Sequence, residues 1–136
     1  MKTQVGMIKN RKEKATQKLI EAIESNNYHT SVGFIGVRPL IQFLSENGYK
    51  NVMYRLLAQE ESPGWLHFVK DERSTMGENL NAQGYGTNHH PFATNIGFWL
   101  FEHLSGVKID FSKHPTISLN PGLNVDVQWV KTSQET

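Results

Sequence analysis

The residues best suited to chemistry are gathered in one polar segment, residues 71–90. It contains the carboxylate of Glu78, a stretch rich in glycine and asparagine, and the adjacent imidazoles of His89 and His90. Long loops in a compact domain are usually functional or disordered, and reactive side chains toward both ends of this one favour a functional site. A loop carboxylate held by rigid helices can reach a substrate, and glycoside hydrolysis uses two carboxyl groups. The alternative is that Glu78 is a solvated surface residue.

The two histidines do not indicate a metal site. On a helix, neighbouring side chains point about 100° apart, so His89 and His90 could not chelate one ion by helical spacing. The chain has no cysteine and no HExxH pattern, and it lacks P-loop, GxGxxG and GxSxG motifs. We therefore expect neither a metal nor a cofactor. A histidine here is a candidate hydrogen-bond donor to a substrate, or alternatively a helix-capping group.

Two aromatic residues flank this segment or lie within it, Trp65 and Tyr85. Aromatic faces can stack against the C–H faces of sugar rings, so both are candidate substrate-binding residues, although aromatic residues more often belong to a core. Trp99 lies on the apolar face of a predicted helix and is expected in the core. His29 sits in a glycine-containing loop, and the sequence alone gives it no role.

The bulk composition narrows the class of protein. The chain has 136 residues and a formal net charge of +1, with 14 basic and 13 acidic residues. A balanced charge argues against a general nucleic-acid binder, which needs a clustered cationic surface. No apolar run approaches the length of a membrane span, about 20 residues. Without cysteine the redox compartment, and so the localisation, stays open.

Hydrophobic periodicity predicts a mainly α-helical first part. Asn47–Gly48 is predicted to end the second helix with a left-handed residue, so that helices two and three form a hairpin. Residues 65–69 are predicted to be extended. The expected helices cover residues 11–25, a segment with Pro39 in its first turn, residues 50–59 and residues 92–104.

After Gly106 the pattern changes to the alternation typical of strands. Strands are expected at residues 107–111, 116–119 and 125–129. Three strands without a return partner make a poor independent sheet. Residues 1–9 also resemble the tail of an element that began earlier. We therefore interpret the chain as a fragment.

Several stretches, taken in order, resemble the bacterial α-L-rhamnosidases. Residues 27–36 (NYHTSVGFIG) resemble the HxTxGFxG segment of that family, and residues 74–78 (STMGE) stand at its TTxWE motif. Residues 54–60 with 63–66 resemble the family's next hairpin and turn. Its NHxxxG…GDWLYxxxAGI helix is matched by residues 88–92, 97–100 and 104–107. Residues 127–131 resemble the start of its β-sandwich.

This resemblance implies the last helical hairpins of an (α/α)6 toroid over residues 1–105, then the opening strands of a C-terminal β-sandwich over residues 106–136. It implies an inverting hydrolase of terminal α-L-rhamnosides, with Glu78 as general base and His90 hydrogen-bonding the rhamnose. The general acid of the family lies upstream and has no match here, so we expect the chain to be inactive alone. Gly77 departs from the family's tryptophan.

Two alternatives to this interpretation remain open. One is a non-catalytic carbohydrate-binding or structural helical module; the other is a small hydrolase completed by oligomerisation, with Asp71 or Glu72 as the acid. Apolar residues with too few partners argue against the first and favour self-association. They are Val5, Met7, Ile8, Phe34, Ile35, Phe98 and Trp99.

Overall fold

A computed structural model describes residues 4–70, 91–112, 114–122 and 127–133. Helices dominate, and the described residues include one two-stranded antiparallel sheet, as the sequence predicts for the fold class. The elements are α1 (Gln4–Ser25), α2 (Phe34–Glu46), α3 (Lys50–Leu57), α4 (Trp65–Lys70), α5 (Pro91–Trp99), the π-helix η1 (Leu100–Leu104), β1 (Val107–Asp110) and β2 (Thr116–Leu119).

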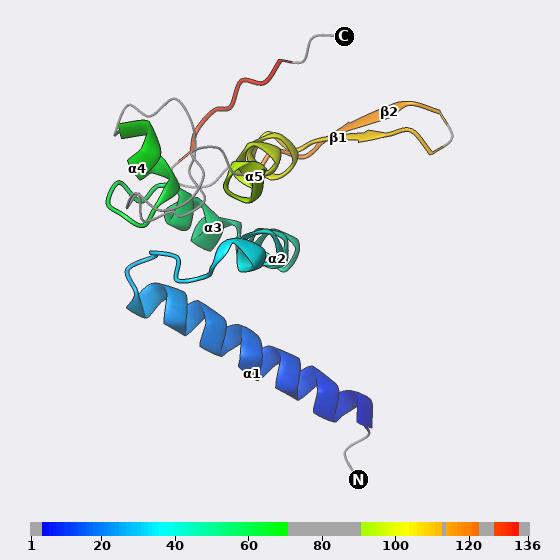
Figure 1. Cartoon of the computed structure of the whole chain (residues 1–136). Helices are drawn as coiled ribbons and strands as arrows, with labels where there is room; N and C mark the ends of the chain where they lie inside the picture. Colours follow the sequence, from blue (N-terminus) through cyan, green and yellow to red (C-terminus); the bar gives the residue numbers. More distant parts are fainter. Residues whose placement is uncertain (1–3, 71–90, 113, 123–126, 134–136) are drawn as a thin grey trace.

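Helix α1 is longer than predicted, because it begins at Gln4 rather than near residue 11. Among its described side chains, those that pack on the core are Leu19, Ile20 and Ile23, in its second half. Residues 8–15 are all exposed, and this part of α1 extends past the remaining helices (Figure 1). Lysine, glutamine and glutamate are good helix formers, so the polar first half can continue the helix without burying a face.

Helix α2 also begins earlier than predicted. It starts at Phe34 behind an extended Gly33, so Pro39 lies inside the helix instead of in its first turn. The prediction gave weight to the two glycines as loop formers, but the buried stripe already starts at Val37. It continues with Leu40, Ile41 and Leu44, at the three- and four-residue spacing of one helical face.

The predicted stop between α2 and α3 is confirmed. Gly48 has a φ of +87°, and the Tyr49 amide donates to the Leu44 carbonyl at 2.8 Å. This is the hydrogen bond of a Schellman cap, which a left-handed glycine makes accessible. Helices α2 and α3 contact each other across the turn and form the expected hairpin.

The prediction that residues 65–69 are extended is wrong, because these residues belong to α4. Trp65 and Phe68 are both buried, three residues apart on one face. The predicted helix over residues 92–104 is present as α5 followed by η1. Ile96 and Trp99 are buried, whereas Leu100 is partly exposed and Phe98 largely so.

The core is one cluster to which every described helix from α1 to α5 contributes. Helix α2 lies between α1 and the other helices (Figure 1). Its fully buried members are Trp65, Trp99, Phe68, Leu44, Met53 and Leu56. Trp99 therefore does not belong to the exposed apolar surface expected from the sequence. Ile8, Ile35 and Phe98 do, whereas the side chains of Val5, Met7 and Phe34 lie outside the described ones.

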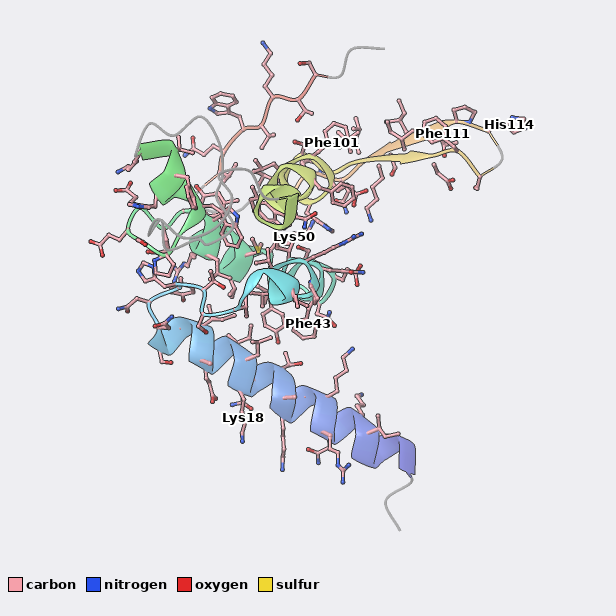
Figure 2. The ribbon with its side chains drawn as sticks, viewed as in Figure 1. Lys18, Phe43, Lys50, Phe101, Phe111 and His114 are labelled. Carbon is pink, nitrogen blue, oxygen red and sulfur yellow. The ribbon has the colours of Figure 1, made fainter. Side chains whose placement is uncertain are left out.

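Strands β1 and β2 form a hairpin that projects from the end of η1 (Figure 1). Val107 pairs with Leu119 and Ile109 with Ile117, so these four side chains share one face of the sheet. Figure 2 shows Phe111 and His114 near the hairpin tip, away from the helices. The third predicted strand lies partly outside the described residues; Val127 forms an isolated bridge, and residues 128–133 form no strand.

Candidate functional site

The segment singled out by the sequence, residues 71–90, lies outside the described residues, and with it Glu78, Tyr85, His89 and His90. The structure describes the two helices that bound it in sequence. Helix α4 ends at Lys70, and α5 begins at Pro91. How firmly these two ends are held determines how well the segment can be positioned, because catalytic groups need a rigid support.

Trp65, the remaining candidate, lies in the first turn of α4 and is 2% exposed. It belongs to the core cluster with Phe68 and Leu56. An indole enclosed in this way has no open face for a sugar ring, so the structure favours the core alternative for this residue. Its contribution to a site would be to fix α4 rather than to touch a substrate.

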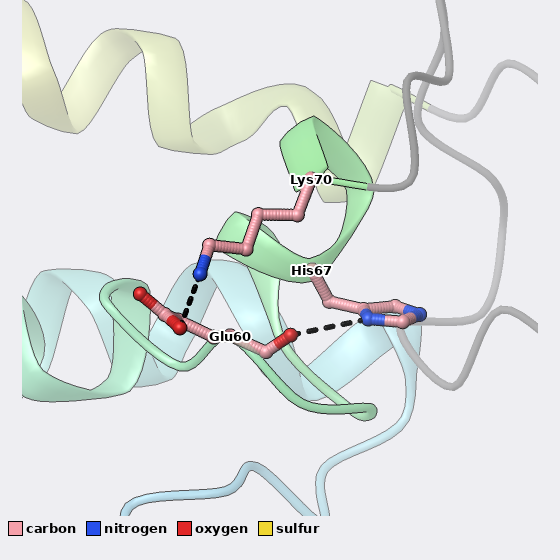
Figure 3. Close-up of polar contacts among 3 residues, drawn as sticks. All are labelled: Glu60, His67 and Lys70. Carbon is pink, nitrogen blue, oxygen red and sulfur yellow. Dashed lines mark hydrogen bonds and ion pairs between the residues drawn. The ribbon is translucent and has the colours of Figure 1, made fainter.

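The turn before α4 holds that helix through polar contacts (Figure 3). The side chains of Lys70 and Glu60 form an ion pair, and the Nδ1–H of His67 donates to the Glu60 carbonyl at 3.2 Å. The ion pair is about half exposed, so it contributes little by itself. Gly64 sits so close to the chain that a Cβ would lie 2.8 Å from the carbonyl oxygen of Gln59. The tight turn therefore depends on glycine.

A second contact ties this turn to a distant loop. The Nδ1–H of half-buried His29 donates to the carbonyl of Pro63 at 3.0 Å. His29 follows the end of α1, 34 residues away from its acceptor. The neighbouring Tyr28 holds the same loop to α3, because its hydroxyl accepts from Arg55 at 2.8 Å and its ring lies 5.0 Å from the guanidinium carbon. Sequence reasoning gave His29 no role, and a local pattern carries no signal for so distant a partner.

The other end of the segment leads into α5, which is anchored through its last residue, Trp99. The Nε1–H of Trp99 donates to Ser45 Oγ at 2.7 Å, and Ser45 Oγ donates to the Ile41 carbonyl at 2.7 Å. Both side chains are buried, so the hydrogen bonds satisfy polar groups that would otherwise be costly. This chain of contacts holds α5 on α2, while the core and the Pro63 turn hold α4.

The described residues thus form a support of two anchored helices, α4 and α5. Within the described ranges, no group of three or more histidine, aspartate or glutamate side chains is arranged to hold a metal ion. The candidate carboxylate, Glu78, lies in residues 71–90, which follow α4 directly.

Comparison with known families decides what kind of support this is. Residues 1–104 match the family described as the bacterial alpha-L-rhamnosidase 6 hairpin glycosidase domain. The chain belongs to this family. Its helices are accordingly part of the helical toroid of a six-hairpin glycosidase domain.

Curated members of the bacterial α-L-rhamnosidase family are similar over most of this chain. The alpha-L-rhamnosidase of Formosa agariphila is 31% identical over an alignment of 120 positions, gaps included, that covers 81% of this chain and 13% of that protein. The alpha-L-rhamnosidase of Alteromonas sp. is 28% identical over an alignment of 145 positions, gaps included, that covers 88% of this chain and 16% of that protein. The chain therefore spans only a small part of the length of these relatives.

One solved structure agrees with the family assignment, and a second agrees with the fold. The alpha-L-rhamnosidase of Aspergillus terreus superimposes with a TM-score of 0.61 at 29% identity, over 70% of this chain and 12% of that one. The alpha-L-rhamnosidase of Dictyoglumus thermophilum superimposes with a TM-score of 0.60 at 20% identity, over 74% of this chain and 11% of that one. At that identity the second comparison supports the fold alone.

Among the described helices, none has the length and apolar character needed to cross a membrane.

Proposed function

We propose that this chain is part of the catalytic domain of an inverting glycoside hydrolase that releases terminal α-L-rhamnose from glycosides or oligosaccharides. Glu78 is the general base that deprotonates the attacking water, and His90 hydrogen-bonds the bound sugar. Tyr85 is a candidate wall of the sugar pocket. Trp65 supports α4 from the core, where it is 2% exposed.

The observation that carries this proposal is the family match over residues 1–104, which includes the whole of residues 71–90. It is supported by the two anchored helices that bound the segment. Trp99 and Ser45 fix α5, and His29 fixes the turn before α4. A general base must be held within hydrogen-bond reach of its water, so a rigid support at both ends serves such a residue.

We further propose that the chain alone does not turn over substrate. Inversion needs a second carboxyl group about 6.5–9.5 Å from the base, so that a water fits between them. The sequence supplies no match to the family's acid, and a base without its acid loses both proton transfer and orientation. The partner acid then comes from outside this chain.

The first experiment is hydrolysis of a chromogenic α-L-rhamnoside by this chain and by its Glu78→Gln variant. We expect no turnover from either. Turnover that disappears in the variant would instead show a complete site and overturn the proposal that the acid is missing.

The role of Glu78 is tested in a completed domain. This chain replaces the matching segment of the Formosa agariphila relative, and hydrolysis is compared with the Glu78→Gln variant. Loss of the general base should lower kcat by about 10²–10⁴-fold. Glu61→Gln, at an exposed glutamate before α4, is the matched control and should change little. An active chimera with equal rates for both variants would rule out Glu78, and proton NMR of the first-formed sugar anomer would test inversion.

We also propose that the chain self-associates through its exposed apolar side chains. Ile35 in α2 is 74% exposed, and Ile117 and Leu119 of β2 are 68% and 72% exposed on one sheet face. Large exposed apolar patches favour association. Sedimentation velocity over a range of concentrations should show mass increasing with concentration, and Ile117→Thr with Leu119→Thr should reduce it. A monomer throughout would contradict the proposal.

A further inference from the structure

Two adjoining cavities lie on the side of the molecule where η1 meets α2 and the β-hairpin. Their volumes are about 420 and 380 Å³, and both are lined by Glu46, Glu102, His103 and Lys108. We call them together the α2–η1 groove. Volumes of this order are typical of small-molecule sites. The residues that line the groove come from α2, α3, α5, η1 and the hairpin, so the core positions its walls.

The groove contains charged side chains of both signs that do not pair with one another. Glu46 and Glu102 supply carboxylates, and Arg38, Lys50 and Lys108 supply cations (Lys50 is labelled in Figure 2). Within the described part of the chain, none of these five forms an ion pair. Glu46 accepts a hydrogen bond from Gln42 at 2.9 Å. The groove therefore presents separate groups that only accept and groups that only donate.

This arrangement of charges favours a ligand without net charge. An anion would meet two carboxylates, and a cation would meet three positive side chains. A neutral ligand with several hydroxyl groups fits both, because each hydroxyl can donate to a carboxylate and accept from an ammonium or guanidinium group. A sugar carries such hydroxyls at neighbouring ring positions.

The same groove has an apolar wall and an irregular helix. Phe98 lines it and is 61% exposed, so its ring is available to the C–H face of a sugar. Glu102 and His103 belong to the π-helix η1, a geometry found frequently at functional sites. Burial lowers the pKa of His103, which favours the neutral imidazole with one donor and one acceptor.

We propose that the α2–η1 groove is a binding site for a neutral saccharide, with a sugar ring on Phe98 and its hydroxyls bonded by Glu102 and Lys108. The groove consists of described residues outside 71–90, so the site does not depend on the role of Glu78. It adds a place where a carbohydrate is held, beyond the proposed hydrolysis of the glycosidic bond.

The test is an NMR titration of the ¹⁵N-labelled chain with methyl α-D-glucopyranoside and methyl α-L-rhamnopyranoside. Sodium acetate and choline chloride serve as the anionic and cationic probes. We expect saturable amide shifts in residues 38–46 and 95–108 with at least one of the glycosides, and none that saturate with the two ions. Shifts confined to residues 71–90, or saturable only with an ion, would overturn the inference while leaving the proposed hydrolase untouched.

Matched variants then locate the ligand. Phe98→Ala and Glu102→Gln should each raise Kd by about threefold to tenfold, the range for loss of one contact. Phe111→Ala removes a more exposed phenylalanine from the hairpin, and Glu61→Gln removes an exposed carboxylate elsewhere; both should leave Kd unchanged. Circular dichroism checks that each variant is folded. Equal effects of Phe98→Ala and Phe111→Ala would contradict a site in the groove.

Discussion

The indole of Trp99 in α5 and the hydroxyl of Ser45 in α2 share a hydrogen bond of 2.7 Å inside the core. The two residues are 54 positions apart in sequence. Since the Ser45 hydroxyl also donates a hydrogen bond to the Ile41 carbonyl, one hydroxyl satisfies the indole and links it to the backbone of α2. The orientation of α5 on α2 is therefore set by a directional contact as well as by apolar packing.

Removing this hydroxyl should destabilise the chain. In Ser45→Ala the buried Trp99 N–H loses its acceptor, which costs about 1–3 kcal/mol of unfolding free energy. Urea unfolding followed by circular dichroism measures the change. Ser25→Ala is the control, because that hydroxyl is exposed and bonds the Ala22 carbonyl within the last turn of α1. It should change stability by no more than about 0.5 kcal/mol. Similar values for the two variants would show that the buried contact has no special role.

The contact between His29 and Pro63 should be replaceable by one other side chain. His29→Ala removes the donor to the Pro63 carbonyl and should cost about 0.5–1.5 kcal/mol. In His29→Asn the amide nitrogen can occupy the place of Nδ1, so part of the loss should be recovered. Hydrogen exchange of residues 58–70 measures the local effect. If alanine and asparagine give the same exchange rates, the hydrogen bond does not stabilise the turn.

Glycine substitutions should have opposite effects in the turn before α4 and in α5. In Gly64→Ala the new Cβ would lie 2.8 Å from the Gln59 oxygen and 2.9 Å from the Glu61 oxygen, so we expect a loss of about 1–3 kcal/mol. In Gly97→Ala the new Cβ meets no atom of the described residues within 4 Å, so the change should stabilise α5 by about 0.4–1 kcal/mol. Thermal unfolding of both variants measures the two signs. Equal signs would contradict the packing at Gly64.

The free energy of unfolding should decrease as the pH is lowered, because His103 becomes protonated. Burial, the largest cause, lowers its pKa; Lys50 and Lys108 lower it further, while Glu102 and Glu46 oppose the shift. The unfolded chain therefore binds the proton more readily, and the contribution of neutral His103 is complete above about pH 6.5 and is lost as the pH falls below it.

The measurement is the unfolding free energy between pH 8 and pH 5 in wild type and His103→Gln. The wild type should lose more stability on acidification than the variant. His114→Gln changes an exposed histidine near the hairpin tip and should follow the wild type. A wild-type curve parallel to that of His103→Gln would contradict the expected effect of burial.

The features that the sequence predicted correctly depend on neighbouring residues. Asn47–Gly48 ends α2 because a left-handed residue is needed there, and the alternation after Gly106 produces β1 and β2. The errors arise where distant contacts decide. Residues 65–69 look like a strand on periodicity alone, but Trp65 and Phe68 reach the core only from one face of a helix. Pro39 suggested a helix start, whereas Val37 and Leu40 already belong to the buried stripe.

In the candidate site too, residue type and local pattern could be read from the sequence, whereas burial and distant contacts could not. Glu78 and His90 were selected by residue type and by resemblance, and they remain predictions because they lie outside the described residues. Trp65 was ambiguous, since an aromatic residue beside a polar loop can serve a sugar or a core, and only its burial separates the two. His29 could not be found from the sequence, because the carbonyl that it binds belongs to Pro63, 34 residues later.

The π-helical turn at Leu100–Leu104 also sets the direction in which the hairpin leaves the helices. A π-turn holds about one residue more than an α-turn, and each residue advances a helix by about 100°. Shortening this stretch by one residue would restore α-helical phase and swing β1 around the axis of α5, while Ile96 and Trp99 stayed in place. A single insertion or deletion in this stretch would thus rotate the hairpin relative to the helices without changing the packing of the core.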